Sequence, residues 1–318
     1  MNRYQAHWTD ELRAAIGEPS TWSRMAALPA LGFCNRMILP AAFWPPTVMD
    51  ELNPLREKLQ HQWKGERFTI ETPDGAHLDG MRFAAIDPEP CQRPTMLYFA
   101  GNGEAYEFNP DIVAMATAEL KCNYVTFNYR QVGASRGRLN RDGLIIDGYS
   151  MLQVIDDHLL QKGDNRRLFI HARSLGGAIG PVSAAAYQQG QRPTGICSER
   201  SFCSLEVEAG SLFRGTALGW GADKLLRATG WALDCKAAWQ QISGKKIIVY
   251  SKSDSIVPYS ASLLASLPDQ EREKTTVIEL TQAWEMEPHN VPLYSVHPDW
   301  YDPQAFALFK QTVLSILD

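Results

Sequence analysis

A serine between small residues is the feature of the sequence that most clearly suggests chemistry. Ser174 lies in HARSLGGAIG, residues 171–180, with Ala172 two positions before it and Gly176 two positions after it. Small residues at those positions permit the sharp strand-to-helix turn called a nucleophile elbow, which holds the serine in strained backbone with its hydroxyl exposed. The helix that follows points N–H groups and its positive dipole end toward the same place. We therefore predict that Ser174 is a nucleophile.

A serine hydroxyl is a weak nucleophile at neutral pH and needs a histidine base that is itself oriented by a carboxylate. In hydrolases with this elbow the chain order is serine, acid, histidine. Asp254 follows the apolar run 246–251, and His289 follows the apolar run 275–280 after a short loop. These positions predict Asp254 as the acid and His289 as the base.

Other residues compete for both roles. His297 lies shortly after His289 and is the alternative base, while Asp234 is the alternative acid. Asp254 could instead be a turn or helix-capping aspartate. His171 lies inside the run before the elbow, and we expect it to be hydrogen-bonded or partly buried rather than catalytic.

Acyl transfer also needs two donors where negative charge develops on the carbonyl oxygen. We expect one to be the backbone N–H of Leu175, the residue after the nucleophile. The second is predicted to be the main-chain N–H of Asn102 in FAGNGEAYE, residues 99–107, where Gly101 and Gly103 let the backbone approach a ligand closely.

These residues must be positioned by the elements around them, and the sequence alternates short apolar runs with helical patterns. A turn at PDG predicts a β-hairpin of two strands, and the later runs are continuous enough for buried parallel strands. We expect a mostly parallel α/β sheet of about eight strands with helices on both faces and a small helical cap. The expected strands are 67–71, 77–83, 95–100, 123–129, 168–172, 194–199, 246–251 and 275–280, and the expected helices are 109–120, 142–161, 175–189 and 306–317.

Two regions lie outside that alternation. Residues 1–66 are predicted to be an N-terminal arm of helices and turns packed on the core domain, 67–318, with a cap insertion at about 204–243. The apolar stretch 25–44 contains prolines, Asn and Arg, so it would span a bilayer poorly. It either packs on the body or contacts a membrane surface. Aromatic residues of the cap favour an apolar acyl pocket or lid, although core packing explains them equally well: Phe213, Trp220, Trp231 and Trp239.

Composition excludes several function classes. The 318 residues are 45% hydrophobic and 21% charged, which is ordinary for a folded protein, and the net charge of −5 argues against a general nucleic-acid binder. The six scattered cysteines favour reduced thiols, and the sequence implies no metal and no organic cofactor. The GNG string at 101–103 lacks the third glycine of a dinucleotide fingerprint because Tyr106 stands there, and no P-loop occurs. The N-terminus has no signal-peptide pattern, so we expect a cytoplasmic protein or export by another route.

Four motifs in order resemble the α/β-hydrolase superfamily: the loop AGNGE, the run NYRQVGASRG at 128–137, the elbow RSLGG, and the Asp254 segment. They are similar to a serine hydrolase branch with GRSLGG elbows, which includes bacterial hydrolases, some of them secreted effectors. The resemblance covers about residues 67–318. It implies Ser174, Asp254 and His289 as the triad and Asn102 with Leu175 as oxyanion donors. Two positions depart from the pattern, since Ala172 replaces the usual glycine and Ala100 a common histidine.

Three hypotheses follow. The first is a serine esterase that cleaves carboxylic esters, including lipid-like acyl esters, through an acyl-enzyme. The second is a catalytically idle binding or effector protein on the same fold. The third is a peptidase or thioesterase with the same triad. The expected partner is a small-molecule or lipid ester; the sequence sets no oligomeric state. In 128–137 we expect Arg130 and Arg136 to anchor the loop by salt bridges.

Overall fold

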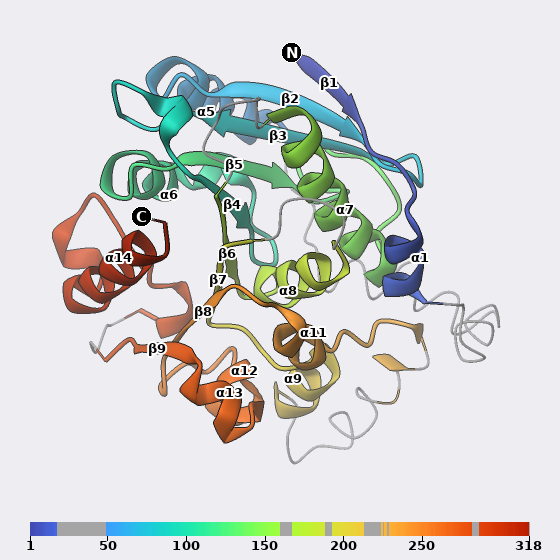
Figure 1. Cartoon of the computed structure of the whole chain (residues 1–318), viewed down its shortest axis with the longest axis vertical. Coiled ribbons are helices and arrows are strands. Elements are labelled where there is room, and N and C mark those ends of the chain that lie inside the picture. Colours follow the sequence, from blue (N-terminus) through green and yellow to red (C-terminus); the bar gives the residue numbers. More distant parts are fainter. Residues whose placement is uncertain are drawn as a thin grey trace.

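The computed structural model describes residues 1–17, 49–159, 167–187, 193–212, 224, 226–227, 229–281 and 286–317. Within these residues nine strands form one sheet in the order β1-β2-β3-β5-β4-β6-β7-β8-β9 (Figure 1). Strand β3 runs antiparallel to β2 and β5, and the other neighbours are parallel. The strands are β1 Asn2–Gln5, β2 Glu66–Glu71, β3 His77–Phe83, β4 Thr95–Phe99, β5 Asn123–Asn128, β6 Leu168–Arg173, β7 Gly195–Glu199, β8 Lys245–Tyr250 and β9 Thr275–Glu279.

Helices cover both faces of this sheet, as the sequence predicts. On one side lie α1 (Asp10–Ile16), α7 (Arg141–Val154), α8 (Gly176–Ala186) and α11 (Cys235–Gln241), and on the other lie α6 (Pro110–Ala114) and α14 (Pro303–Leu317) (Figure 1). The remaining α-helices are α5 Met49–Gln62, α9 Leu205–Leu212, α12 Leu263–Ser266 and α13 Asp269–Glu273, with short 3-10 turns at Pro90–Gln92, Tyr106–Phe108, Tyr259–Ala261, Pro288–Asn290 and Pro298–Trp300.

The central strands form because their side chains are apolar on both faces. Every residue of β4 and β7 is buried, which matches the continuous runs in the sequence. The predicted hairpin is confirmed: β2 pairs with β3 so that Thr69 lies opposite Asp79, and Gly75 supplies the left-handed turn with φ +80°. The predicted helices at 109–120 and 142–161 also form, but each ends in a turn of π-helix, Met115–Glu119 and Ile155–Leu159.

The described residues form nine strands where about eight are predicted, because β1 is an additional strand. It lies in the segment expected to hold only helices and turns. Its four residues are polar and mostly exposed, so no apolar alternation marks it; its place depends on backbone pairing with the edge of β2. The boundary at residue 66 stays a prediction, and the stretch 25–44 lies outside the described residues.

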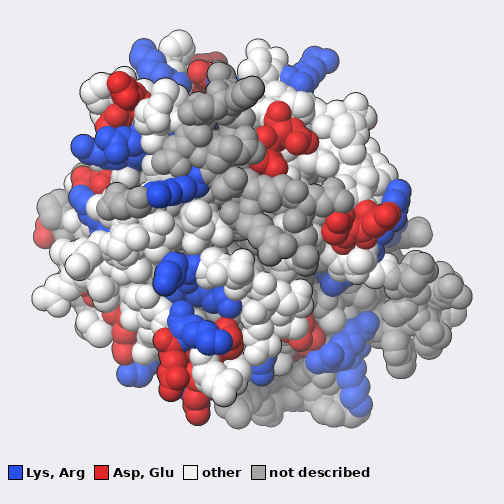
Figure 2. Space-filling view, in the orientation of Figure 1, with Lys and Arg blue, Asp and Glu red and all other residues white. Residues whose placement is uncertain are grey.

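The cap region at 204–243 is helical where it is described, with α9 and α11, while 213–223 lies outside the described residues. Trp231 and Trp239 are buried in the main core, so core packing explains these two aromatic residues. Phe213 and Trp220 lie outside the described part of the chain. Across the described residues no helix is both long and apolar enough to cross a bilayer. On the face shown in Figure 2, basic and acidic side chains are interspersed rather than gathered by sign.

The loop 128–137 is anchored as part of the scaffold. The buried Arg130 guanidinium pairs with Asp147, 2.7 Å away, and with Asp74 of the hairpin turn, also 2.7 Å away. The predicted salt-bridge role of Arg130 is therefore confirmed. Arg136 differs from the prediction, since its guanidinium donates to the carbonyls of Gly133 and Ser135 at 3.0 Å. Backbone carbonyls of a tight loop offer acceptors that a sequence pattern does not reveal.

Candidate active site

Ser174 lies on the sharp turn between β6 and α8. Its φ is +50°, in the left-handed region that side chains rarely adopt, and its N–H donates to the Glu199 carbonyl at 2.8 Å. Gly176 is required for a steric reason, because a Cβ there would lie 2.3 Å from the Phe99 carbonyl oxygen. The turn therefore has the tight geometry that the small residues of the motif predict.

Ala172, which replaces the usual glycine of the motif, has an explanation in packing. A Cβ placed on Gly180 of α8 would lie 3.1 Å from the Ala172 methyl group. The missing side chain at Gly180 thus leaves room for that methyl between β6 and α8. Gly180 of α8 thus accommodates alanine in place of glycine at position 172.

Asp254 and His289 come from separate loops and meet Ser174. The Ser174 Oγ lies 2.9 Å from His289 Nε2, and His289 Nδ1 lies 2.8 Å from Asp254 Oδ2. Asp254 follows β8, and His289 lies in the 3-10 turn Pro288–Asn290 after β9. The second carboxylate oxygen of Asp254 accepts the N–H groups of Ile256 at 3.0 Å and Val257 at 2.8 Å, which fixes the carboxylate. An ionised carboxylate only accepts, so Nδ1 carries the proton and the Nε2 lone pair faces the serine hydroxyl.

The two expected oxyanion donors come from segments that adjoin Ser174. Leu175 is the first residue after the nucleophile, and the loop carrying Asn102 packs against Ser174, since a Cβ on Gly101 would lie 3.4 Å from the Ser174 Cβ. Neither the N–H of Leu175 nor that of Asn102 donates a hydrogen bond to another described residue. Both groups are thus free to bind an anion, and their role in catalysis stays a prediction.

Two known proteins are similar to this chain in sequence. No family model matches the chain. The α/β hydrolase domain-containing protein WAV2 of Arabidopsis thaliana is 25% identical over 233 residues, 70% of this chain and 72% of WAV2. Protein bem46 of Schizosaccharomyces pombe is 27% identical over 203 residues, 61% of this chain and just under two thirds, 65%, of bem46.

Solved structures agree with these relatives. An α/β hydrolase from Vibrio vulnificus superposes with a TM-score of 0.61 at 14% identity, covering 100% of this chain and 97% of that one. An esterase from Pyrococcus furiosus superposes with a TM-score of 0.57 at 13% identity, covering 86% and 96%. The chain has the α/β-hydrolase fold. The resemblance stated from the sequence is confirmed at that level.

The residues predicted as alternative base and acid have other contacts. His297 is exposed in the turn Pro298–Trp300 region, where its ring lies against Trp300 with centroids 4.9 Å apart. Asp234 caps α11 by accepting the Lys236 N–H at 3.0 Å. His171 is buried and its Nε2 lies 2.6 Å from Glu199 Oε2, so its predicted structural role is confirmed. The geometry brings only the first choice of base and acid to the serine.

Sequence reasoning missed a buried charged cluster behind the triad. Arg173 and Glu104 lie on one side of Glu199, and Arg200 and His171 contact it directly. Burial alone would raise the pKa of the Glu199 carboxyl, but the Arg200 guanidinium and the hydrogen bond with His171 together hold that pKa well below its usual value. Glu199 is therefore a buried carboxylate ion. The cluster combines β6, the end of β7 and the loop after β4, which are far apart in sequence, so no single local pattern indicates it.

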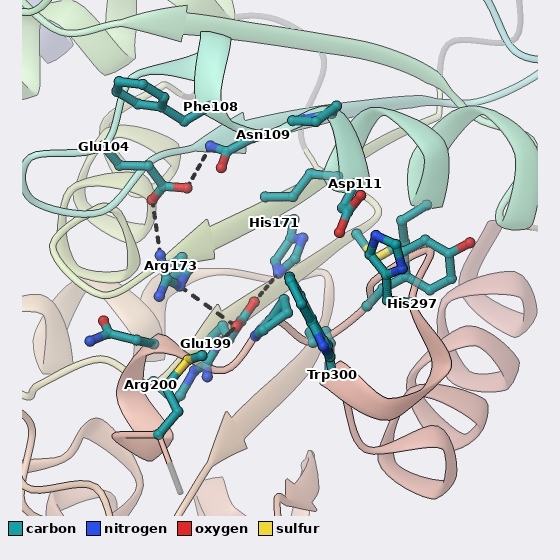
Figure 3. A pocket seen from close by; sticks show the side chains of 18 residues that line it. Glu104, Phe108, Asn109, Asp111, His171, Arg173, Glu199, Arg200, His297 and Trp300 are labelled. Atoms are coloured by element: carbon teal, nitrogen blue, oxygen red, sulfur yellow. Dashed lines mark hydrogen bonds and ion pairs between the residues drawn. The ribbon is translucent and has the colours of Figure 1, made fainter. Parts of the chain in front are cut away.

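A cavity of about 460 Å³ lies between the loop before α6 and the segment 286–300 (Figure 3). No side chain of the triad lines it, but Arg173 and Asn290, the chain neighbours of Ser174 and His289, do. The charged cluster forms part of its lining. Most of its remaining lining is apolar: Phe108, Pro110, Ile112, Met115, Met286, Pro292, Leu293, Tyr294 and Trp300. An acyl pocket or lid at the cap stays a prediction, because Phe213 and Trp220 lie outside the described residues. In the described residues no group of three His, Cys, Asp or Glu side chains could hold a metal ion.

Proposed function

We propose that this chain is a serine hydrolase that cleaves carboxylic esters of apolar acyl groups through an acyl-enzyme intermediate. The observation that carries the proposal is the unbroken hydrogen-bonded series from Ser174 Oγ through His289 to Asp254, at 2.9 and 2.8 Å. Each member has the orientation its role requires, and the fold is one that esterases share.

The chemistry follows from that geometry. Ser174 Oγ attacks the ester carbonyl carbon while His289 Nε2 takes the hydroxyl proton. The resulting oxyanion accepts the N–H groups of Leu175 and Asn102, and Asp254 stabilises the imidazolium. The tetrahedral intermediate collapses to an acyl-serine, and His289 returns the proton to the departing alcohol. Water then attacks the acyl group with His289 as base, which releases the carboxylic acid and restores the serine.

The cavity lined by Arg173 and Asn290, the chain neighbours of Ser174 and His289, supports an apolar acyl group. Its walls are apolar and aromatic over most of their extent, and several rim side chains, including Phe108, Met286 and Trp300, are exposed to solvent. Binding an aliphatic chain there would remove apolar surface from water on both sides of the contact. The same triad can also cleave thioesters and amides. The preferred leaving group is therefore found by comparing hydrolysis rates on an ester, a thioester and an amide with the same acyl group.

Ser174→Ala tests the nucleophile. We expect ester hydrolysis to fall by about four orders of magnitude or more, because the covalent step is lost. Ser315→Ala, at an exposed position of α14, is the matched control and should keep full activity. Hydrolysis rates of p-nitrophenyl esters of increasing chain length should rise from acetate to medium chains. Full activity of Ser174→Ala would rule out the mechanism, and a preference for acetate would rule out the apolar acyl group.

Labelling by a fluorophosphonate probe separates the enzyme from an idle binding protein. The probe reacts only with an activated serine, so mass spectrometry should find the adduct on Ser174. A folded protein that takes up no label and turns over no ester, thioester or peptide would favour the binding protein.

A further inference from the structure

The side chain directly before the nucleophile connects the two loops that complete the site. Arg173 Nη1 donates to Glu104 Oε2 at 3.3 Å, and Arg173 Nη2 donates to the main-chain oxygen of His289 at 2.8 Å. Figure 3 shows Arg173 between Glu104 and Glu199 on the wall of the cavity. One planar guanidinium thus contacts the loop after β4 and the loop that carries the base.

Glu104 carries this contact onward to the expected oxyanion donor. Its Oε2 accepts the Gly101 N–H at 2.6 Å, and its Oε1 accepts the Tyr98 hydroxyl at 3.0 Å and the Asn109 amide at 2.5 Å. Gly101 is bonded directly to Asn102. A carboxylate with four donors has little freedom to move, so the backbone at 101–102 is held relative to Arg173.

Arg200 supports the base loop but does not replace this link. It donates to the carbonyls of Pro288, at 2.7 Å, and Val291 and pairs with Glu199, and no contact joins it to Glu104. Arg173 alone among the described residues bonds both Glu104 and the His289 backbone. Burial opposes its charge, yet Glu104 raises the pKa of Arg173, so Arg173 is a cation at neutral pH.

We propose that Arg173 is a positioning residue, which holds the oxyanion loop through Glu104 and the base loop through the His289 carbonyl in register with Ser174. The inference rests on the proposed hydrolase function. Arg173 touches none of the groups that exchange bonds or protons. Its loss should therefore lower the rate of the chemical step more than it weakens substrate binding, because misplacement by about 1 Å can cost up to about 100-fold in rate.

Arg173→Met removes both contacts, and Arg173→Lys keeps the charge with a single donor centre. We expect kcat to fall about 10- to 100-fold in the Met variant with KM changed less than about 3-fold, and the Lys variant to recover part of the loss. Arg82→Met, which removes an arginine from the β2–β3 surface ion pair with Glu66, is the matched control and should leave kcat unchanged. Melting temperatures confirm that each variant is folded.

Glu104→Gln tests the route of the effect, since the amide oxygen can still accept the Gly101 N–H while the ionic contact with Arg173 is lost. If Arg173 acts partly through Glu104, the loss of kcat in the double variant should be clearly smaller than the product of the two single losses. Simple multiplication of the two losses, or a raised KM with unchanged kcat in Arg173→Met, would overturn the proposal. Where Arg173→Met fails to fold, Arg173→Lys and its double variant with Glu104→Gln decide the question.

Ser174→Ala separates the two claims. Activity that depends on Ser174 but not on Arg173 overturns the positioning role and leaves the hydrolase intact. Activity that survives Ser174→Ala overturns the hydrolase itself.

Discussion

The backbone of Ser174 is strained. A left-handed conformation costs a non-glycine residue about 1–2 kcal/mol, and Ser174 adopts it at φ +50° while its N–H is held by Glu199. The strain is tolerated because β6 and α8 are fixed on both sides of the turn. This free-energy cost comes from the backbone conformation at residue 174 and does not depend on the hydroxyl group.

Two substitutions at this position separate strain from chemistry. Ser174→Gly and Ser174→Ala both remove the nucleophile, but only glycine relieves the left-handed strain. We expect the free energy of unfolding of the Gly variant to exceed that of the Ala variant by about 1 kcal/mol, which a higher urea midpoint would show. Both variants should lack hydrolase activity. An Ala variant as stable as the Gly variant would show that the turn carries no strain.

At the residue scale, what could be predicted was local or fixed in chain order. The elbow is five contiguous residues, and Asp254 and His289 follow it in the order that the fold requires. Arg173 was visible only as part of the elbow, because Glu104 lies far away in sequence and the His289 contact is to a backbone carbonyl. Neither partner leaves a pattern in the sequence.

At the scale of elements, the turn at 73–75 identified the β2–β3 hairpin, and continuous apolar runs identified the six later strands. Strand β1 was missed because it pairs at an exposed edge with polar side chains. The π-helical turns that end the two helices were also missed, since one extra residue per turn changes the periodicity too little to detect in a short helix.

Helix α9 brings an unusual carboxyl toward the site. Glu208 is buried, and neither of its carboxylate oxygens has a hydrogen-bond partner among the residues that the structure describes. Burial, and to a lesser extent the Asp254 carboxylate, raise the pKa of Glu208 to about 8. The folded protein therefore holds Glu208 protonated at neutral pH, whereas the unfolded chain ionises it near its usual value of 4.5.

The sign of the resulting pH dependence is set by proton binding. Between about pH 4.5 and 8 the folded state binds more protons at Glu208 than the unfolded state does, so this group lowers stability as the pH rises and has its full effect above pH 8. Glu208→Gln removes the titration. We expect it to stabilise the protein at pH 8.5 by on the order of 2 kcal/mol and to change little at pH 5, measured by urea unfolding. Equal shifts at both pH values would contradict the assignment.

At the scale of the whole molecule, the N-terminal region is joined to the site through a buried polar network. Arg56 of α5 donates to the Tyr106 hydroxyl at 3.1 Å and pairs with Glu107, and its Nε lies 3.5 Å from Asp79 of β3. Tyr106 and Glu107 directly follow the loop that carries Asn102. Helix α5 therefore holds, through Arg56, the segment that follows the loop of the proposed oxyanion donor. The sequence could not show this network because its members lie on three separate elements.

Breaking this network tests whether the N-terminal region is integral to the fold. Arg56→Met leaves Glu107 buried without its charge partner, whereas Asp79 keeps Arg67 at 2.5 Å, and breaking a buried pair costs about 3–5 kcal/mol. We expect a matching loss of stability in urea unfolding and a lower kcat at temperatures where the variant is folded, since Tyr106 also loses a donor. Lys58→Met, at an exposed position of the same helix, should change stability by less than about 0.5 kcal/mol. If both variants are equally stable, α5 contributes no more than surface packing, and the buried charges must be satisfied without it.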